Sequence, residues 1–279
     1  MTLGFMFVEI VGGWMAHSLA LLADAGHMFT DAAALALAWG AVYFARRPPD
    51  AKRSFGYQRL QVLAAFVNGL ALLAIVVGIA IEAIRKLLAP APINAHLMLG
   101  VAALGAVVNL VVFAMLRHGD RDGQNMNVAA AILHVLGDLL GSIGAVIGAI
   151  VIIYTGFTPI DAILSLLLCA LIVRSAWMLV RKSTHILLEG APEWLNMEEL
   201  VSGLRQAVPA IQDVHHAHCW SLSPNETLLT LHATIAANAD VAAVLQASRE
   251  FLRSRYGITR ATVQIEPVAC VETHGHACC

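Results

Sequence analysis

The sequence contains few charged residues. Lys, Arg, Asp and Glu make up 13% of its 279 residues, about half of the roughly 25% that is usual in a soluble domain. This shortage excludes a disordered chain and a soluble enzyme. The formal net charge of -2 provides no basic surface, so the sequence also excludes a nucleic-acid binder.

Two further features are missing from the sequence. No spaced framework of cysteines is present, because four of the five cysteines lie in the last third of the chain. This indicates a reducing compartment for that part. The first residues show neither a basic start nor a cleavage site, so they do not read as a signal peptide.

Long apolar runs are abundant instead. Hydrophobic residues make up 59% of the chain and the mean hydropathy is +0.74, which predicts an integral membrane protein. We expect membrane spans at residues 20–45, 58–87, 93–117, 125–153 and 158–181. Residues 2–15 are apolar apart from Glu9 but short. We expect there a first helix that has lost its beginning, or else a short helix at the membrane surface.

Basic residues predict the orientation in the membrane. The loop after the second span holds five Lys and Arg residues, whereas the opposite side holds only Arg85 and Lys86. Because cytoplasmic loops are enriched in Lys and Arg, both termini are expected in the cytoplasm.

Two of the apolar spans each contain a histidine and an aspartate four positions apart, His27 with Asp31 and His134 with Asp138. Residues i and i+4 share one face of a helix. A charged group at the bilayer centre costs at least about 2.5–3.5 kcal/mol, so it is kept where it is paired, hydrated or functional. If the two helices face each other, two imidazoles and two carboxylates meet at one point.

These four side chains match a tetrahedral zinc site, since zinc binds His nitrogen and Asp oxygen. Two carboxylates neutralise the metal charge, and the empty site favours protons, so metal and proton compete. The alternative is two separate His–Asp hydrogen bonds, which leaves the repetition of the pair unexplained. Asp24 either supports the metal site or packs between helices. We expect hydrogen bonds between helices from the remaining polar residues, Glu9, Asn68, Asn109, Ser142 and Asp161.

Several motifs together resemble the cation diffusion facilitator family of zinc transporters, over nearly the whole chain. These motifs are residues 18–27 with Asp31, Phe55-Gly-Tyr-Gln-Arg59 with the apolar run to Gly69, Asn127 ahead of His134 and Asp138, and residues 187–192. The chain departs from many relatives in lacking a His-rich N-terminus. Its loop 117–124 also holds a single histidine, so a metal-collecting role of this loop is not expected.

The resemblance implies an all-α bundle of six transmembrane helices in residues 1–190 and a cytoplasmic α+β ferredoxin-like domain in residues 191–279. It implies a homodimer that exports metal in exchange for protons. It also implies that His27, Asp31, His134 and Asp138 form the transport site, of the kind that prefers zinc and sometimes takes cadmium or cobalt.

Residues 191–279 themselves predict a small α-β-β-α-β domain. Asn196 is suited to begin a helix that runs to about Val208, and Asp240 to begin one that stops at Gly257. Strands are expected over residues 214–222, 227–236 and 261–265, the last from its strict alternation.

By resemblance, His215 and His232 are zinc ligands of this domain. Alternation puts His232 on the polar face of its strand and Glu266 on the polar face of the last strand, whereas Arg260 stands where the family often has a histidine. Cys278 and Cys279 are candidates for replacement ligands, the alternative being a flexible, solvated thiol end. His216, His218 and Cys219 are expected in strand packing or at the surface.

We therefore expect a dimeric transporter in a bacterial cytoplasmic membrane, with zinc as its substrate and as a regulatory ligand. No cofactor and no enzymatic activity are expected. The alternatives are an efflux protein that prefers Mn²⁺, Fe²⁺ or a broader range, a membrane metalloenzyme, and a metal sensor without transport. A metalloenzyme needs an open zinc position and a separate acid or base, and a sensor needs no intramembrane pairs.

Overall fold

The computed structural model describes residues 2–45, 47–119, 126–224 and 226–266. Contacts divide the chain into two compact units. The first unit comprises Met1–Gly40 and Ala64–Val180, and the second comprises Ala41–Leu63 and Arg181–Cys279. The connection between the second and third helices thus belongs with the C-terminal part of the chain.

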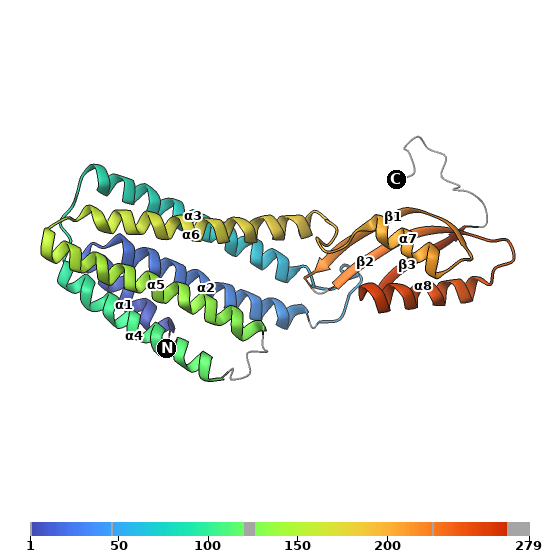
Figure 1. The fold of residues 1–279 in the computed structure, drawn as a ribbon, viewed down its shortest axis with the longest axis horizontal. Coiled ribbons are helices and arrows are strands. Elements are labelled where there is room, and N and C mark those ends of the chain that lie inside the picture. Colours follow the sequence, from blue (N-terminus) through green and yellow to red (C-terminus); the bar gives the residue numbers. More distant parts are fainter. Residues whose placement is uncertain (1, 46, 120–125, 225, 267–279) are drawn as a thin grey trace. The chain divides into compact units, whose positions relative to one another are not determined.

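Six helices precede the C-terminal domain in the described part of the chain, as predicted (Figure 1). They are α1 (Thr2–Ala16), α2 (Leu19–Ala45), α3 (Leu60–Leu88), α4 (Ala95–Gly119), α5 (Met126–Thr155) and α6 (Pro159–Leu187). Among the described residues, four of them are long and apolar enough to cross a membrane, namely α3, α4, α5 and α6.

The first two helices differ from these four. Helix α1 has 15 residues, or about 22 Å at 1.5 Å per residue, which is shorter than a bilayer core of about 30 Å. Helix α2 has 27 residues and sufficient length, but it holds Asp24, His27 and Asp31 and is not among the four.

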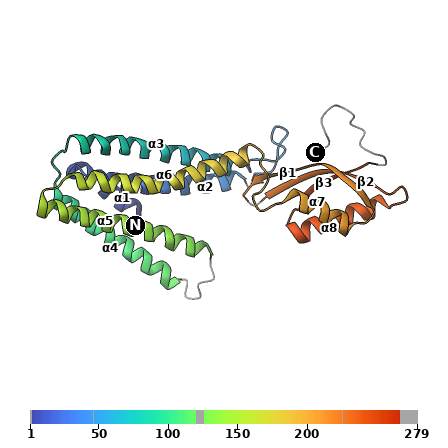
Figure 2. The same cartoon turned by 45° about the horizontal axis from the view of Figure 1, so that its top comes forward.

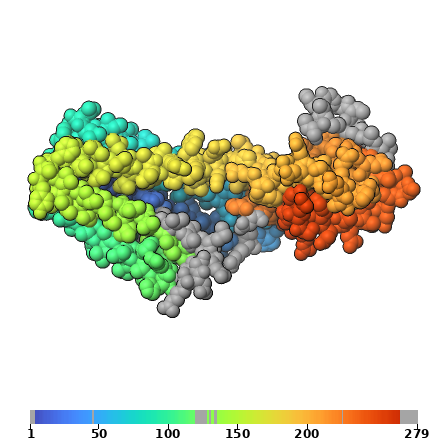
Figure 3. Space-filling model, viewed as in Figure 1, coloured from blue at the N-terminus to red at the C-terminus, as the bar shows by residue number. Residues whose placement is uncertain are grey.

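Large apolar side chains cover the outside of the helices. Helix α6 runs along the surface of the helical unit (Figure 3), and its Leu167 and Trp177 are each 60% exposed. The inside is packed with small residues, such as Ala16, Ala83 and Ala149, each 0% exposed. Small residues let helix backbones approach closely, which is how helices associate in lipid.

Five elements form the C-terminal domain in the predicted order (Figures 1 and 2). These are α7 (Met197–Ala207), β1 (Ile211–Ser223), β2 (Glu226–Ile235), α8 (Val241–Tyr256) and β3 (Arg260–Glu266). The sheet has the order β1-β2-β3, with β1 antiparallel and β3 parallel to β2. Both helices cover one face of the sheet (Figure 2), and Leu200, Leu204 and Leu252 are fully buried in the core between them.

The predicted helix ends of this domain are confirmed by hydrogen bonds. The Asn196 side chain accepts from the backbone N–H groups of Glu198 and Glu199 at 3.0 and 3.3 Å. Asp240 accepts from Ala242 N at 2.9 Å. Gly257 ends α8 in the left-handed conformation with φ 66°, where glycine is favoured.

Gly69 allows the close approach of α3 and α6. A Cβ atom at this position would lie 2.8 Å from Val180 Cγ2 and 3.5 Å from the Ala176 carbonyl oxygen. Gly78, on the same helix, has no heavy atom within 4 Å of such a Cβ. The two glycines therefore differ in packing while sharing a helix.

We predict that Gly69→Ile destabilises the protein by about 1–3 kcal/mol, because overpacking forces the helices apart. The measurement is the melting temperature in detergent, followed by size-exclusion chromatography. Gly78→Ile is the matched control and is expected to leave the melting temperature unchanged. Equal melting temperatures for the two variants contradict the tight α3–α6 contact.

Candidate metal centres

The His–Asp pair of α2 lies beside the aspartate of α5. His27 Nδ1 is 3.6 Å from Asp31 Oδ2, and His27 Nε2 is 3.8 Å from Asp138 Oδ1. The three side chains are between 17% and 34% exposed. The structure thus brings together three of the four residues that the sequence singled out.

His134 lies on α5, one helical turn before Asp138. Its side chain is outside the part of the chain that the structure describes. On the backbone, His134 lies in the first third of α5 (Met126–Thr155). The prediction that His134 is a ligand therefore rests on the sequence alone.

A cavity opens beside His27 and Asp138. Its volume is about 210 Å³, enough to admit several water molecules. Helices α2 and α5 contribute Asp24, His27, Asp138 and two glycines, and α6 contributes Leu168, Leu171, Ile172 and Ser175. The wall is thus polar where the ionisable groups lie and largely apolar on the α6 side.

A second group of ionisable side chains lies on the sheet of the C-terminal domain. His215 and His232 are directly opposite each other in the β1–β2 register. Both contact Glu266 at the end of β3, His215 Nε2 at 3.1 Å and His232 Nδ1 at 2.8 Å. Glu266 is only 5% exposed, so three strands meet at one buried carboxylate.

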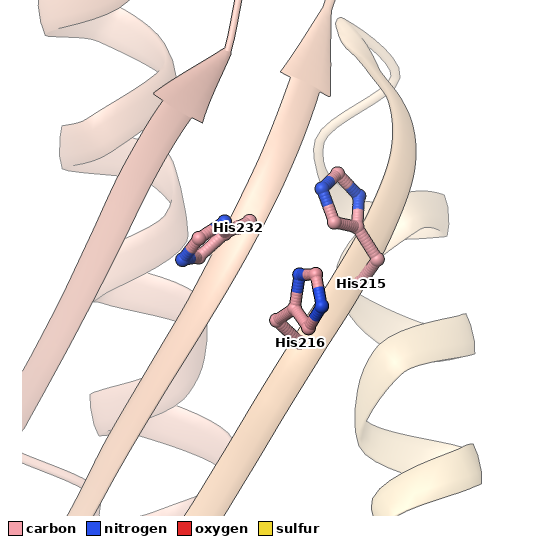
Figure 4. A group of neighbouring side chains, drawn as sticks. All are labelled: His215, His216 and His232. Carbon is pink, nitrogen blue, oxygen red and sulfur yellow. The ribbon is translucent and has the colours of Figure 1, made fainter. Parts of the chain in front are cut away.

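His216 belongs to this group, although the sequence analysis placed it in packing or at the surface. The β1–β2 register shifts between His215 and His218, and His216 has a positive φ of 48°. Successive side chains of a regular strand point to opposite faces, but this bulge turns His216 toward His215 and His232 (Figure 4). One ring nitrogen from each of the three histidines lies within 4.8 Å of the others.

The histidines keep Glu266 ionised. Burial raises the pKa of the Glu266 carboxyl, but hydrogen bonds from His215 and His232 outweigh it, so the pKa lies below its usual value. Carboxylates bind metals in the ionised form. The three imidazoles can therefore offer nitrogens to one cation, with an ionised carboxylate hydrogen-bonded to two of them.

His218 and Cys219 are not part of the group. Cys219 is buried on β1, and His218 pairs with Thr230 beyond the bulge. Burial raises the pKa of the Cys219 thiol to about 11, so the thiol stays protonated near neutral pH. Cys278 and Cys279 lie outside the described residues.

Two families of domains match the chain in sequence. The cation efflux transmembrane domain matches residues 1–188, and the cation efflux protein cytoplasmic domain matches residues 193–268. The chain belongs to the cation efflux family. This membership confirms the predicted class of protein, a membrane transporter rather than an enzyme.

Cation efflux proteins of several bacteria are similar over most of their length. The zinc transporter ZitB of Escherichia coli is 47% identical over 277 residues, covering 99% of this chain and 87% of ZitB. The metal cation efflux system protein CzcD of Cupriavidus metallidurans is 38% identical, with 95% and 84% covered. The cadmium, cobalt and zinc/H(+)-K(+) antiporter of Bacillus subtilis is 35% identical, with 99% and 88% covered.

The raised pKa of Cys219 makes its thiol unreactive in the folded protein. At pH 7.5 we expect alkylation by N-ethylmaleimide to be on the order of 100-fold slower for Cys219 in the native protein than in urea, because the thiolate is the reactive form. Peptide-resolved mass spectrometry measures the two rates. Equal rates in buffer and urea contradict the burial of this thiol.

Proposed function

We propose that this cation efflux protein exports Zn²⁺ from the cytoplasm in exchange for protons, with His27, Asp31, His134 and Asp138 as its transport site. The observation that carries the proposal is that His27, 3.6 Å from Asp31 on its own helix, lies 3.8 Å from Asp138 of α5 beside a cavity. The names of the relatives support zinc, with cadmium and cobalt as further substrates.

The chemistry of the donor set favours zinc. Zinc in proteins is bound by about four ligands, with His nitrogen and Asp oxygen at about 2.0–2.2 Å. Donor atoms of such a tetrahedron lie about 3.3 Å apart. One ion uses only one nitrogen of an imidazole. If His27 binds through Nε2, Asp138 Oδ1 at 3.8 Å needs a small shift, whereas Asp31, which faces Nδ1, has to move further to reach the same ion. An efflux protein that prefers Mn²⁺ or Fe²⁺ is the second candidate, since carboxylate oxygens suit these ions.

Proton exchange follows from the same groups. Imidazole and carboxylate bind zinc only when deprotonated, so loading the site from the cytoplasm releases protons. Protons on the other side of the membrane compete for these groups and release the metal. Exposure of one site to each side in turn is the way in which secondary transporters couple two ions.

Asp138→Ala is expected to abolish metal uptake, because it removes one carboxylate ligand and leaves the 2+ charge half compensated. The measurement is zinc-dependent uptake into inverted membrane vesicles with a pH gradient, with protein levels checked by immunoblot. Asp50→Ala, in the exposed connection between α2 and α3, is the control and should transport like the wild type. Normal uptake by inserted Asp138→Ala protein refutes the site.

We further propose that the C-terminal domain forms the homodimer interface in the cytoplasm and binds a regulatory zinc ion. Its ligands are His215, His232 and, from the bulge, His216, while Glu266 orients two of these imidazoles through hydrogen bonds. The supporting observation is the set of three imidazoles whose nitrogens lie within 4.8 Å of one another beside an ionised carboxylate. Cys278 and Cys279 remain candidates for additional ligands.

A second zinc ion is expected to bind to full-length protein through these histidines. In an Asp138→Ala background, which removes the transport site, His232→Ala should abolish the remaining tight zinc binding measured by isothermal titration calorimetry. His218→Ala, on the same sheet but outside the group, should retain it. If both variants bind zinc equally well, the ligands of this site lie elsewhere.

A further inference from the structure

A carboxylate at the start of α6 holds the first turn of α2. Asp161 is 0% exposed and accepts three hydrogen bonds. Leu19 N donates to its Oδ2 at 2.7 Å, while Ala20 N and the Ser18 hydroxyl donate to its Oδ1 at 3.2 and 2.6 Å. All three donors belong to the first turn of α2 or the residue before it.

These bonds satisfy groups that a helix cannot satisfy itself. The first four N–H groups of a helix have no partner within it, and they form the positive end of the helix dipole. The hydroxyl of Ser18, the residue before α2, accepts from Leu21 N, at a long 3.4 Å. Asp161 therefore caps α2 from another helix, and its negative charge meets the positive end of α2.

The turn before α2 is held from other sides as well. Lys86 Nζ of α3 donates to the His17 carbonyl oxygen at 2.5 Å, and Asn94 N donates to the Ala16 carbonyl oxygen at 3.0 Å. Leu19 packs against Ala83 of α3 and Ala162 of α6. The Lys86 ammonium thus meets the end of α1 and the Asp161 carboxylate meets the start of α2, so the α1–α2 turn is held from both sides.

We propose that Asp161 is a positioning residue for metal transport, which sets the place of α2 along its axis and thereby the place of His27 and Asp31 relative to Asp138. The inference rests on the proposed transport site. His27 follows Leu19 by eight residues, about 12 Å along a straight helix, so a shift of the first turn is transmitted to the ligands.

The surroundings of Asp161 favour positioning over direct metal binding. It does not line the cavity beside His27 and Asp138, and both of its carboxylate oxygens already accept hydrogen bonds. The connection from α5 to α6, between Thr155 and Pro159, is short. Helix α2 carries one half of the proposed site and α5 carries the other half. Asp161 therefore ties α2 to α6, the helix that directly follows α5.

The test compares four variants in a His232→Ala background, which leaves the transport site as the intended cobalt site. Asp161→Ala removes all three bonds, Asp161→Asn removes the charge and replaces one acceptor with a donor, and Ser18→Ala removes only the hydroxyl bond. Ser165→Ala is the matched control, because its buried hydroxyl bonds within α6, to the Asp161 carbonyl oxygen at 2.6 Å. The readouts are the visible spectrum of bound Co²⁺, KM and kcat for transport, and the pH profile.

Groups that orient metal ligands typically contribute about 10–100-fold to metal affinity. We expect KM to rise by about tenfold or more in Asp161→Asn and Asp161→Ala, less in Ser18→Ala and not in Ser165→Ala. The intense tetrahedral bands of Co²⁺ should weaken in the same order, while size-exclusion chromatography shows folded protein. If Asp161→Ala does not fold, Asp161→Asn and Ser18→Ala still decide the question.

Two outcomes overturn the inference while leaving the proposed function intact. One is a lower melting temperature of Asp161→Asn and Ser18→Ala with unchanged KM and Co²⁺ spectrum, which makes the contact structural only. The other is a shifted pH profile with unchanged KM, which makes Asp161 a proton carrier. If the parent protein shows no tetrahedral Co²⁺ bands and its transport does not depend on Asp138, the proposed transport site itself is wrong.

Discussion

The penalty for ionisable groups in an apolar environment governs the arrangement of the helices. A buried charge is tolerated only where partners replace the water that it has lost. Asp161 obtains three donors from the start of α2. His27 lies between a carboxylate of its own helix and one of α5. Both arrangements join α2 to other helices, because a single helix cannot supply enough partners.

Helix α2 consequently contacts other helices at two places, its first turn and His27, and the two contacts differ in length and burial. At its first turn the bonds to Asp161 are short and fully buried. Two turns further on, the separations of 3.6 and 3.8 Å around His27 are longer than good hydrogen bonds, and a cavity adjoins them. The contact with Asp161 therefore holds the first turn of the helix, whereas the proposed metal site around His27 has room to rearrange.

The C-terminal domain gathers its ionisable groups by different means. The sheet supplies the cross-strand pair His215 and His232, and the end of β3 supplies Glu266. One backbone irregularity adds a third imidazole, since the bulge carries His216 across to the same face. A left-handed residue other than glycine is uncommon, and such strain often accompanies functional sites.

The sequence by itself determined the features that depend on local spacing. The apolar runs predicted the six helices, the i, i+4 pairs placed His27 with Asp31, and Asn196, Asp240 and Gly257 marked helix ends, because all of these are set within a few residues. It also determined the family, since motifs along most of the chain are specific to it. Strand β1 begins three residues earlier than expected, at Ile211, because its pairing with Ile235 and not its own pattern defines that end.

Only the tertiary structure decided which distant groups meet. The bulge that recruits His216 results from the register of β1 on β2, and no local pattern in the sequence distinguishes it from regular alternation. The sequence marked Asp161 as a polar residue that joins helices, but its partners on α2 depend on how α6 docks. Such contacts arise from packing between segments far apart in the chain, so their geometry cannot be derived from periodicity alone.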